Sequence, residues 1–272
     1  PTKNMVNSSW TSTGVTSNSA VTQYTAMGEE LNLKDIGSST TSLTGNYTCS
    51  KNVTVTFKAN GCTTADGSAT MNLYNGSTSG TVTVPTKTMN NDWKTLGASM
   101  SSSSTSNGTP MGSSMTVTGV SSSSTTATAY YNCYKEPKEY AVTFNTNIQN
   151  DGLYNASATA PNGVSCKIAK VYNGDSQATS CNVTMPTFSY ETGEWDFNGW
   201  GTSSSSTSGA DIGSTVAISS SHTRYATWAK PMTVIFKANG CTASDQSVSK
   251  TIYNFPTSFS VNVPTTTMKT EW

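Results

Sequence analysis

Six cysteines are the residues with the clearest capacity for chemistry in this sequence. They are Cys49, Cys62, Cys133, Cys166, Cys181 and Cys241. No two of them have the CxxC spacing of a zinc site, and His222 is the only histidine, so no cluster of thiolates and imidazoles predicts a metal. Disulfide bonds formed in an oxidising compartment are the better explanation.

Candidate catalytic groups are sparse. Serines are abundant, but a nucleophile needs a neighbouring base, and His222 stands alone in SSSHTRY, where we expect an exposed loop residue. The acidic pairs Glu29–Glu30 and Glu191/Glu194 are local, which predicts solvated residues in turns or at strand edges rather than a glycosidase pair. The sequence therefore predicts no enzyme and no cofactor.

One segment has some of the oxygen ligands of a calcium loop. Asn147, Gln149, Asp151 and Gly152 have the spacing, but Ala158 stands where the bidentate glutamate belongs and offers no side-chain oxygen. No glycine-rich loop that could hold a phosphate is present either. We therefore expect no metal site.

The composition is that of a polar, weakly charged chain. It has 43 Ser and 48 Thr among 272 residues, with 11% charged residues and a net charge of zero. No basic run could neutralise a phosphate backbone, so nucleic acid is not an expected partner. No apolar stretch approaches the roughly 20 residues that span a bilayer. Such a composition is also found in disordered chains, but short runs of apolar and aromatic residues recur and predict a folded protein.

The recurrence is a tandem repeat marked by a proline followed by a tryptophan. The tryptophans are Trp10, Trp93, Trp195 and Trp272, separated by 83, 102 and 77 residues. An opening run, NVTVTFKANGC, YAVTFNTN or MTVIFKANGC, aligns Phe57, Phe144 and Phe236. We predict that these residues are the core anchors of each repeat; a ladder of glycan-stacking tryptophans is the alternative.

The repeat phase divides the chain into four modules. Residues 1–51 are the second part of module 1, 52–138 are module 2, 139–230 are module 3 and 231–272 are the first part of module 4. The runs alternate apolar and polar residues and are rich in Val, Thr and aromatics, so they predict a mainly β protein. Serine runs between them predict surface loops. The matching phase of both ends predicts a segment of a longer chain.

The alignment also suggests how the cysteines pair. Cys62 follows the first strand of module 2 and Cys133 lies in its last strand, and such strands are often neighbours, so Cys62–Cys133 is favoured. Cys166 and Cys181 flank a predicted hairpin and form the second expected pair. Cys49 and Cys241 then remain unpaired because of truncation. The rival pairing joins Cys49 to Cys62.

Module 3 resembles the Listeria–Bacteroides repeat, also called the internalin B-repeat. The resemblance rests on YAVTFN, MPTFSYETGEWDFNGWG and RYATWAK, with Trp195, Phe197, Gly199, Trp200, Tyr225, Ala226 and Trp228 at the signature positions. Modules 1 and 2 depart from it, with Val15 and Ala98 in place of Trp200 and with Cys49 and Cys133 in place of Trp228. The resemblance implies tandem β-grasp-like modules on a bacterial cell surface, and it implies no activity.

Two functions follow as expectations. The first is a structural segment of an extracellular stalk, fibre or filament, whose partners are neighbouring modules of the same polypeptide or identical chains. The linkers between modules are very short, which favours end-to-end packing as in repeat arrays. The alternative is the binding region of an adhesin that recognises a host glycan or protein through aromatics such as Tyr130, Tyr131, Tyr134 and Tyr140.

Overall fold

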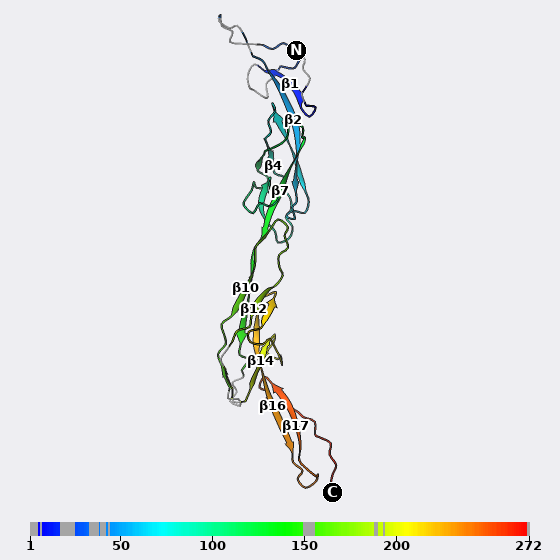
Figure 1. Cartoon of the computed structure of the whole chain (residues 1–272), viewed down its shortest axis with the longest axis vertical. Helices are drawn as coiled ribbons and strands as arrows, with labels where there is room; N and C mark the ends of the chain where they lie inside the picture. Colours follow the sequence, from blue (N-terminus) through cyan, green and yellow to red (C-terminus); the bar gives the residue numbers. More distant parts are fainter. Residues whose placement is uncertain are drawn as a thin grey trace. The chain divides into compact units, whose positions relative to one another are not determined.

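The computed structural model describes residues 5, 7–16, 25–32, 38, 42, 44–148, 156–187, 190–192 and 194–270. Every regular element in this part of the chain is a β-strand, so the prediction of a mainly β protein is confirmed (Figure 1). The seventeen strands are β1 (Thr11–Thr16), β2 (Asn46–Lys58), β3 (Gly67–Tyr74), β4 (Gly80–Thr83), β5 (Lys94–Ser99), β6 (Ser114–Val117), β7 (Thr126–Lys135), β8 (Lys138–Asn145), β9 (Ala156–Ala158), β10 (Val164–Ile168), β11 (Val171–Tyr172), β12 (Cys181–Thr184), β13 (Tyr190–Thr192), β14 (Asp196–Gly201), β15 (Thr215–Ile218), β16 (His222–Phe236) and β17 (Gln246–Tyr253).

The chain folds into two compact units. Unit 1 contains Pro1–Glu136 and Lys170–Gln177, and unit 2 contains Pro137–Ala169 and Ala178–Trp272. The short strand β11 therefore packs in unit 1, although the sequence on both sides of it belongs to unit 2. This division follows spatial contacts, whereas the four predicted modules follow the phase of the sequence repeat.

The main sheet of unit 1 has two parallel strands at its centre. β2 and β7 run parallel, from Thr54 beside Thr126 to Lys58 beside Tyr130. β3 lies antiparallel on the outer side of β2, and β5 lies antiparallel on the outer side of β7. Alternation places Val53, Val55 and Phe57 of β2 on one face, and all three are fully buried, as expected for a strand with one face on the core.

Unit 2 repeats the same arrangement with a more aromatic core. Its sheet has the order β10–β8–β16–β14, and the central strands β8 and β16 are again parallel. Trp200 and Trp228 are fully buried, and the ring of Phe197 contacts both. A two-stranded sheet of β12 and β15 accompanies the main sheet, as β4 and β6 do in unit 1.

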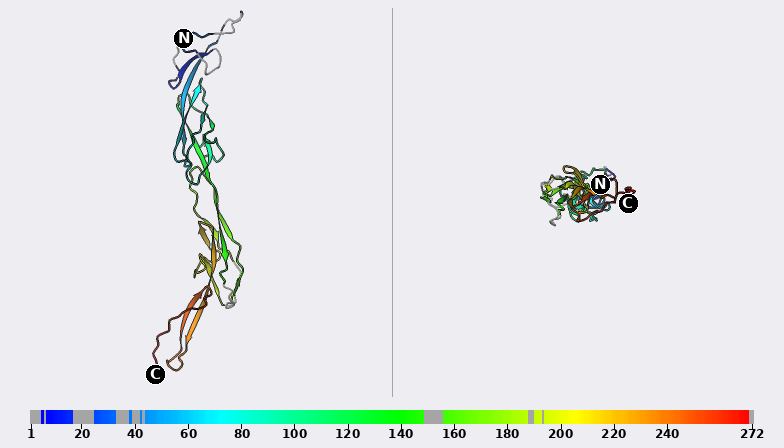
Figure 2. Two further views of the ribbon diagram at one scale, coloured as in Figure 1. Left: turned by 180° about the vertical axis from the view of Figure 1, so that it is seen from behind. Right: turned by 90° about the horizontal axis from the view of Figure 1, so that it is seen from below.

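Two long strands pass through predicted module boundaries without interruption. β2 continues across Lys51–Asn52: it pairs with β1 before the boundary, with β3 from Ser50 onward across it, and with β7 from Thr54. β16 continues across Lys230–Pro231 into an antiparallel hairpin with β17, drawn in orange to red (Figure 2). A single strand thus closes one repeat and opens the next within each unit.

The glycine four residues after each tryptophan has a structural cause. Pairing slips between Thr95 and Gly97 where β5 meets β7, and Gly97 has a φ of +91°. A Cβ atom at Gly97 would lie 2.5 Å from the carbonyl oxygen of Thr109. A β-bulge with a left-handed residue against a neighbouring backbone requires glycine. Gly14 and Gly199 lie at the equivalent bulges.

A lysine–aspartate pair closes the turn after two of the opening strands, β2 and β16. Asp66 accepts hydrogen bonds from Lys58 Nζ at 2.9 Å and from the amide of Ala59 at 2.7 Å. The Lys237–Asp245 pair repeats this geometry. The hydrogen bonds from Lys58 and Ala59 hold the pKa of Asp66 below its ordinary value, and the bond to Asp66 raises the pKa of Lys58.

Asp66 should make unit 1 more sensitive to acid. Because its folded pKa is lowered, its contribution is complete above the unfolded pKa of about 3.9 and is lost as pH falls through the folded value. Asp66→Asn should therefore reduce the stability difference between pH 7 and pH 3 in urea titrations of unit 1. Glu139→Gln, at an exposed ion pair in unit 2, is the control; an unchanged pH profile in Asp66→Asn would refute the assignment.

Candidate functional site

The most distinctive arrangement is a tight turn, here called the tip, that lies at the end of an antiparallel strand and pairs with the last strand of the preceding repeat. Each tip has the sequence Tyr-Asn followed by Gly or Phe. The three tips are Tyr74–Gly76, Tyr172–Gly174 and Tyr253–Phe255, and they follow β3, β11 and β17. The asparagines have φ values of 49°, 50° and 54°, in the left-handed region that asparagine tolerates better than most residues.

Each tip asparagine extends the ladder of the closing strand. The amide of Asn173 donates to the carbonyl of Cys133 at 3.1 Å, and the amide of Cys133 donates to Asn173 Oδ1 at 3.1 Å. The side-chain oxygen therefore does what a strand carbonyl would do. The same pair of bonds joins Asn75 to Cys49, at 2.9 and 3.1 Å, and Asn254 to Trp228, both at 3.0 Å. We call Cys49, Cys133 and Trp228 the closing residues.

The serine runs hold the asparagines through their backbone. Asn173 Nδ2 donates to the carbonyl of Ser104 at 2.9 Å, and Asn254 Nδ2 donates to that of Ser206 at 2.7 Å. Ser104 and Ser206 occupy equivalent positions, seven residues after Gly97 and Gly199. The serine runs were predicted as surface loops, and they are exposed; their carbonyl groups as binding partners were missed because no side-chain pattern marks them.

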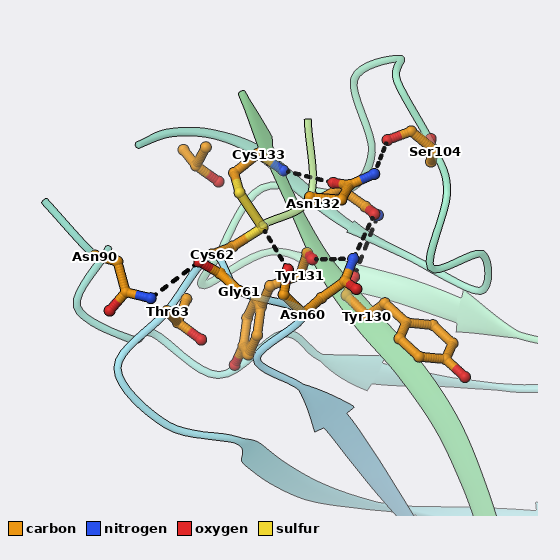
Figure 3. The surroundings of a disulfide bond; sticks show 12 residues. Asn60, Gly61, Cys62, Thr63, Asn90, Ser104, Tyr130, Tyr131, Asn132 and Cys133 are labelled. Carbon is orange, nitrogen blue, oxygen red and sulfur yellow. Dashed lines mark hydrogen bonds between the residues drawn. A yellow bond between two sulfur atoms is a disulfide. The ribbon is translucent and has the colours of Figure 1, made fainter. Parts of the chain in front are cut away.

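A second asparagine holds each of these two serine runs, residues 101–104 and 203–206, from within its own repeat. Asn60 has a φ of 54°, and its Nδ2 donates to the carbonyls of Ser102 at 2.8 Å and Tyr131 at 3.2 Å (Figure 3). Asn147 does the same in unit 2, donating to Ser204 at 2.9 Å and to Ala226 at 3.0 Å. Each of these serine runs is thus held on one side by the opening turn of its own repeat and on the other by the tip of the next repeat.

Replacing Asn60 should weaken unit 1. Asn60→Gly keeps the left-handed backbone but removes the side-chain bonds to two carbonyl groups, so we expect a loss of about 1–3 kcal/mol in the free energy of unfolding. Urea unfolding of the purified chain measures it. Asn239→Gly, at the exposed counterpart in the last repeat, is the matched control. Equal effects of the two substitutions would contradict the role given to Asn60.

The structure joins the four cysteines that the repeat alignment pairs. Cys62 is bonded to Cys133 and both are fully buried (Figure 3). Cys166 of β10 is bonded to Cys181 of β12. Parallel pairing of β2 with β7 brings the turn after β2 to the end of β7, which explains the first bond. The rival pairing of Cys49 with Cys62 is wrong for this structure, because Cys62 already has a partner.

Cys49 and Cys241 are half-buried free thiols. The turn at Cys241 copies the turn at Cys62: the amide of Cys241 donates to Ala238 at 2.9 Å, and that of Cys62 donates to Ala59 at 2.8 Å. Cys49 carries the tip asparagine as Cys133 does. Both thiols therefore occupy cystine positions of the repeat, and truncation as the reason that they are unpaired stays a prediction.

The predicted anchors are placed unevenly. Trp10 and Trp195 are buried, as are Phe57 and Phe144. Trp93 and Phe236 are only half-buried, which corrects the expectation of equal burial; Trp93 packs at the edge of the core, with Lys135 Nζ 5.1 Å from its ring centroid. Trp272 lies outside the described residues. Trp10 and Trp195 are only 7% and 4% exposed, so a ladder of glycan-stacking rings is not supported at those positions.

The tyrosines proposed for ligand binding serve packing in part. Tyr131 is fully buried and donates its hydroxyl to the carbonyl of Pro85 at 2.8 Å, and burial raises its pKa. Tyr130, Tyr134 and Tyr140 are half-buried. Lys170 Nζ lies 3.7 Å from the ring centroid of Tyr134, a cation–π contact. Tyr131 is therefore excluded as a surface contact.

The remaining candidate residues form no reactive group in the part of the chain that the structure describes. His222 is half-buried at the start of β16 rather than in an exposed loop, and its Nε2 accepts from Arg224 at 3.1 Å. Glu29 and Glu30 are exposed, and Glu194 pairs with Lys230, whose hydrogen bond lowers the pKa of that carboxyl.

Among the described residues, no set of three or more His, Cys, Asp or Glu side chains is placed to hold an ion. Asn147 of the calcium-like segment binds backbone carbonyls instead, whereas Gln149, Asp151 and Gly152 lie outside the described residues, as does the side chain of Glu191. The same part of the chain contains no helix that is long and apolar enough to cross a membrane.

Comparison with known proteins leaves the repeat as the main source of evidence. No family model, curated protein or solved structure matches this chain. The resemblance to the Listeria–Bacteroides repeat therefore stays an expectation. The three tips, however, make the same pair of hydrogen bonds three times within one chain, and this repetition identifies the site.

Proposed function

We propose that this chain is a structural segment of an extracellular stalk, fibre or filament, built from β-modules whose closing strands each pair with the tip of the next module. The observation that carries the proposal is the recurring pair of hydrogen bonds between a tip asparagine and a closing residue. A contact repeated at every copy is expected of an array whose function is to hold its modules in sequence.

The sheet order supports β-grasp-like modules. β3–β2–β7–β5 and β10–β8–β16–β14 each place the first and last strands of the repeat side by side and parallel, between two antiparallel strands. A β-grasp-like fold is what the family resemblance implies. The two disulfides favour an oxidising, extracellular setting, and the proposed setting is a bacterial cell surface.

Electron microscopy of the chain and of a genetic tandem of two copies tests the proposal. If modules are held in series, the longest particle dimension should grow in proportion to the number of modules. Compact particles whose longest dimension is nearly the same for one and two copies would refute the structural role. The measurement needs no ligand and no partner protein.

A second candidate, the binding region of an adhesin, is favoured by one observation. An apolar hollow of about 510 Å³ lies beside Trp10, Tyr47 and Cys49 in unit 1. At the equivalent place beside Cys133, the same unit holds the turn that carries Cys62. A glycan and peptide array with the intact chain tests this role, and binding that is lost in Tyr47→Ala would support it.

A further inference from the structure

We infer that the residue after the asparagine in each tip determines which type of closing strand the tip can pair with. Tips ending in glycine fit a closing residue that is cysteine, and the tip ending in phenylalanine fits one that is tryptophan. The inference rests on the proposed function. It adds that the residue pair at each contact determines which module can follow which in the array.

The glycine tip meets a backbone that leaves no room for a side chain. A Cβ atom on Gly61 would lie 2.4 Å from Gly174 Cα, and one on Gly174 would lie 3.0 Å from Gly61 Cα. Both residues have left-handed φ values, +73° and +85°, and the neighbouring Cys62–Cys133 bond ties the Gly61 turn to the closing strand. Only glycine satisfies both the approach and the conformation.

The phenylalanine tip fills a space beside the closing strand whose closing residue is tryptophan. Phe255 is fully buried, with its ring centroid 4.5 Å from that of Trp195 and 5.8 Å from that of Trp228. Its φ of 54° is strained for a bulky residue. A residue held in that conformation where the other tips have glycine indicates that burial of its ring outweighs the strain.

The third tip follows the same rule in residue type. Cys49 is the closing residue there, and Gly76, with a φ of +78°, follows the asparagine. A Cβ atom on Gly76 would have open space around it, so here the left-handed backbone favours glycine and no close contact enforces it. The pairs are thus Cys49 with Gly76, Cys133 with Gly174 and Trp228 with Phe255.

Mismatched pairs should fail for opposite reasons. A phenylalanine in place of Gly174 would collide with the Gly61 turn, whereas a glycine in place of Phe255 would leave a hollow between Trp195 and Trp228. The glycine site would reject a phenylalanine tip by a steric clash, and the phenylalanine site would reject a glycine tip because its core would stay unfilled. Binding sites discriminate between similar partners in this way. A wrong neighbour would thereby be excluded even though its asparagine could still make the hydrogen bonds.

Hydrogen exchange of the intact chain, followed by mass spectrometry of peptides from β7 and β16, tests the inference. Phe255→Gly should speed exchange of the Trp228 amide, which Asn254 protects, by on the order of a hundredfold, and leave the Cys133 amide unchanged. Gly174→Phe should do the reverse. Phe255→Leu keeps an apolar side chain and should show a much smaller effect. If Gly174→Phe does not fold, Gly174→Ala replaces it: its strained φ and close contact should also speed exchange of the Cys133 amide.

The outcomes separate this inference from the proposed function. Asn254→Gly removes the side-chain acceptor without touching Phe255, and fast exchange of the Trp228 amide in that variant supports the tip contact itself. If Asn254→Gly has this effect but Phe255→Gly exchanges like the parent chain, selectivity is refuted and the array stands. If neither variant changes exchange at Trp228, the tip contact and the proposed function are both refuted.

Discussion

Replacing Cys62 and Cys133 together by alanine should lower the free energy of unfolding of unit 1 by about 4 kcal/mol. The bond closes a loop of 71 residues, and such a constraint removes conformational entropy from the unfolded chain in proportion to the logarithm of loop length. It also ties the opening turn to the closing strand where the tip at Asn173 docks. Urea unfolding, with separate probes for the two units, measures the loss.

Two control variants distinguish the effect of losing the Cys62–Cys133 bond from the effect of replacing cysteine side chains elsewhere. Cys166→Ala with Cys181→Ala opens a loop of only 15 residues, so it should cost about 3 kcal/mol and act on unit 2. Cys49→Ala removes a free thiol and should leave both disulfides intact. An unfolding midpoint of unit 1 that stays at the parent value without the Cys62–Cys133 bond would contradict the prediction.

Replacing Trp200 by alanine should lower the free energy of unfolding of unit 2 by about 3–5 kcal/mol. The side chain is fully buried, its ring centroid lies 4.6 Å from that of Phe144, and its Nε1 donates to the carbonyl of Pro186 at 3.4 Å. Removing it leaves a cavity beside the parallel strand pair and an orphaned carbonyl group. Chemical denaturation followed by circular dichroism gives the magnitude.

The effect should be confined to unit 2, because the repeats fill this position differently. Ala98 is the equivalent residue in unit 1, where Phe57 and Tyr131 supply the volume with ring centroids 5.8 Å apart. Ile235→Ala, at a side chain that is 58% exposed, is the control and should change stability by no more than about 0.5 kcal/mol. A loss at Trp200 no larger than at Ile235 would show that this core tolerates the cavity.

Local patterns in the sequence predicted several of the strands. Alternation of apolar residues, as in Val53, Val55 and Phe57, predicts a strand with one buried face, because successive side chains point to opposite sides. The repeat alignment added one long-range fact. Since Cys62 follows the first strand of one repeat and Cys133 lies in its last strand, placing those strands side by side was enough to favour the disulfide that the structure contains.

The candidate site was only partly within reach of the sequence. Tyr-Asn-Gly at residues 74–76 and 172–174 is a visible turn signal, yet it specifies only the left-handed backbone of the tip. It does not specify what the tip contacts. The partners are backbone groups of Cys133 and Ser104, and every residue has such groups, so no side-chain pattern identifies them.

The chain thus determined its strands, its repeat phase and its two disulfides through features that are local or that recur at a fixed phase. Tertiary structure alone decided that Asn173 completes the strand of the repeat before it, that Trp93 stays half-buried while Trp195 is covered, and that Phe255 fills the core beside Trp228. Periodicity describes which face of a strand is buried. It carries no information about which distant backbone reaches the end of that strand, because that choice is made by shape and by hydrogen bonds between segments far apart in the chain.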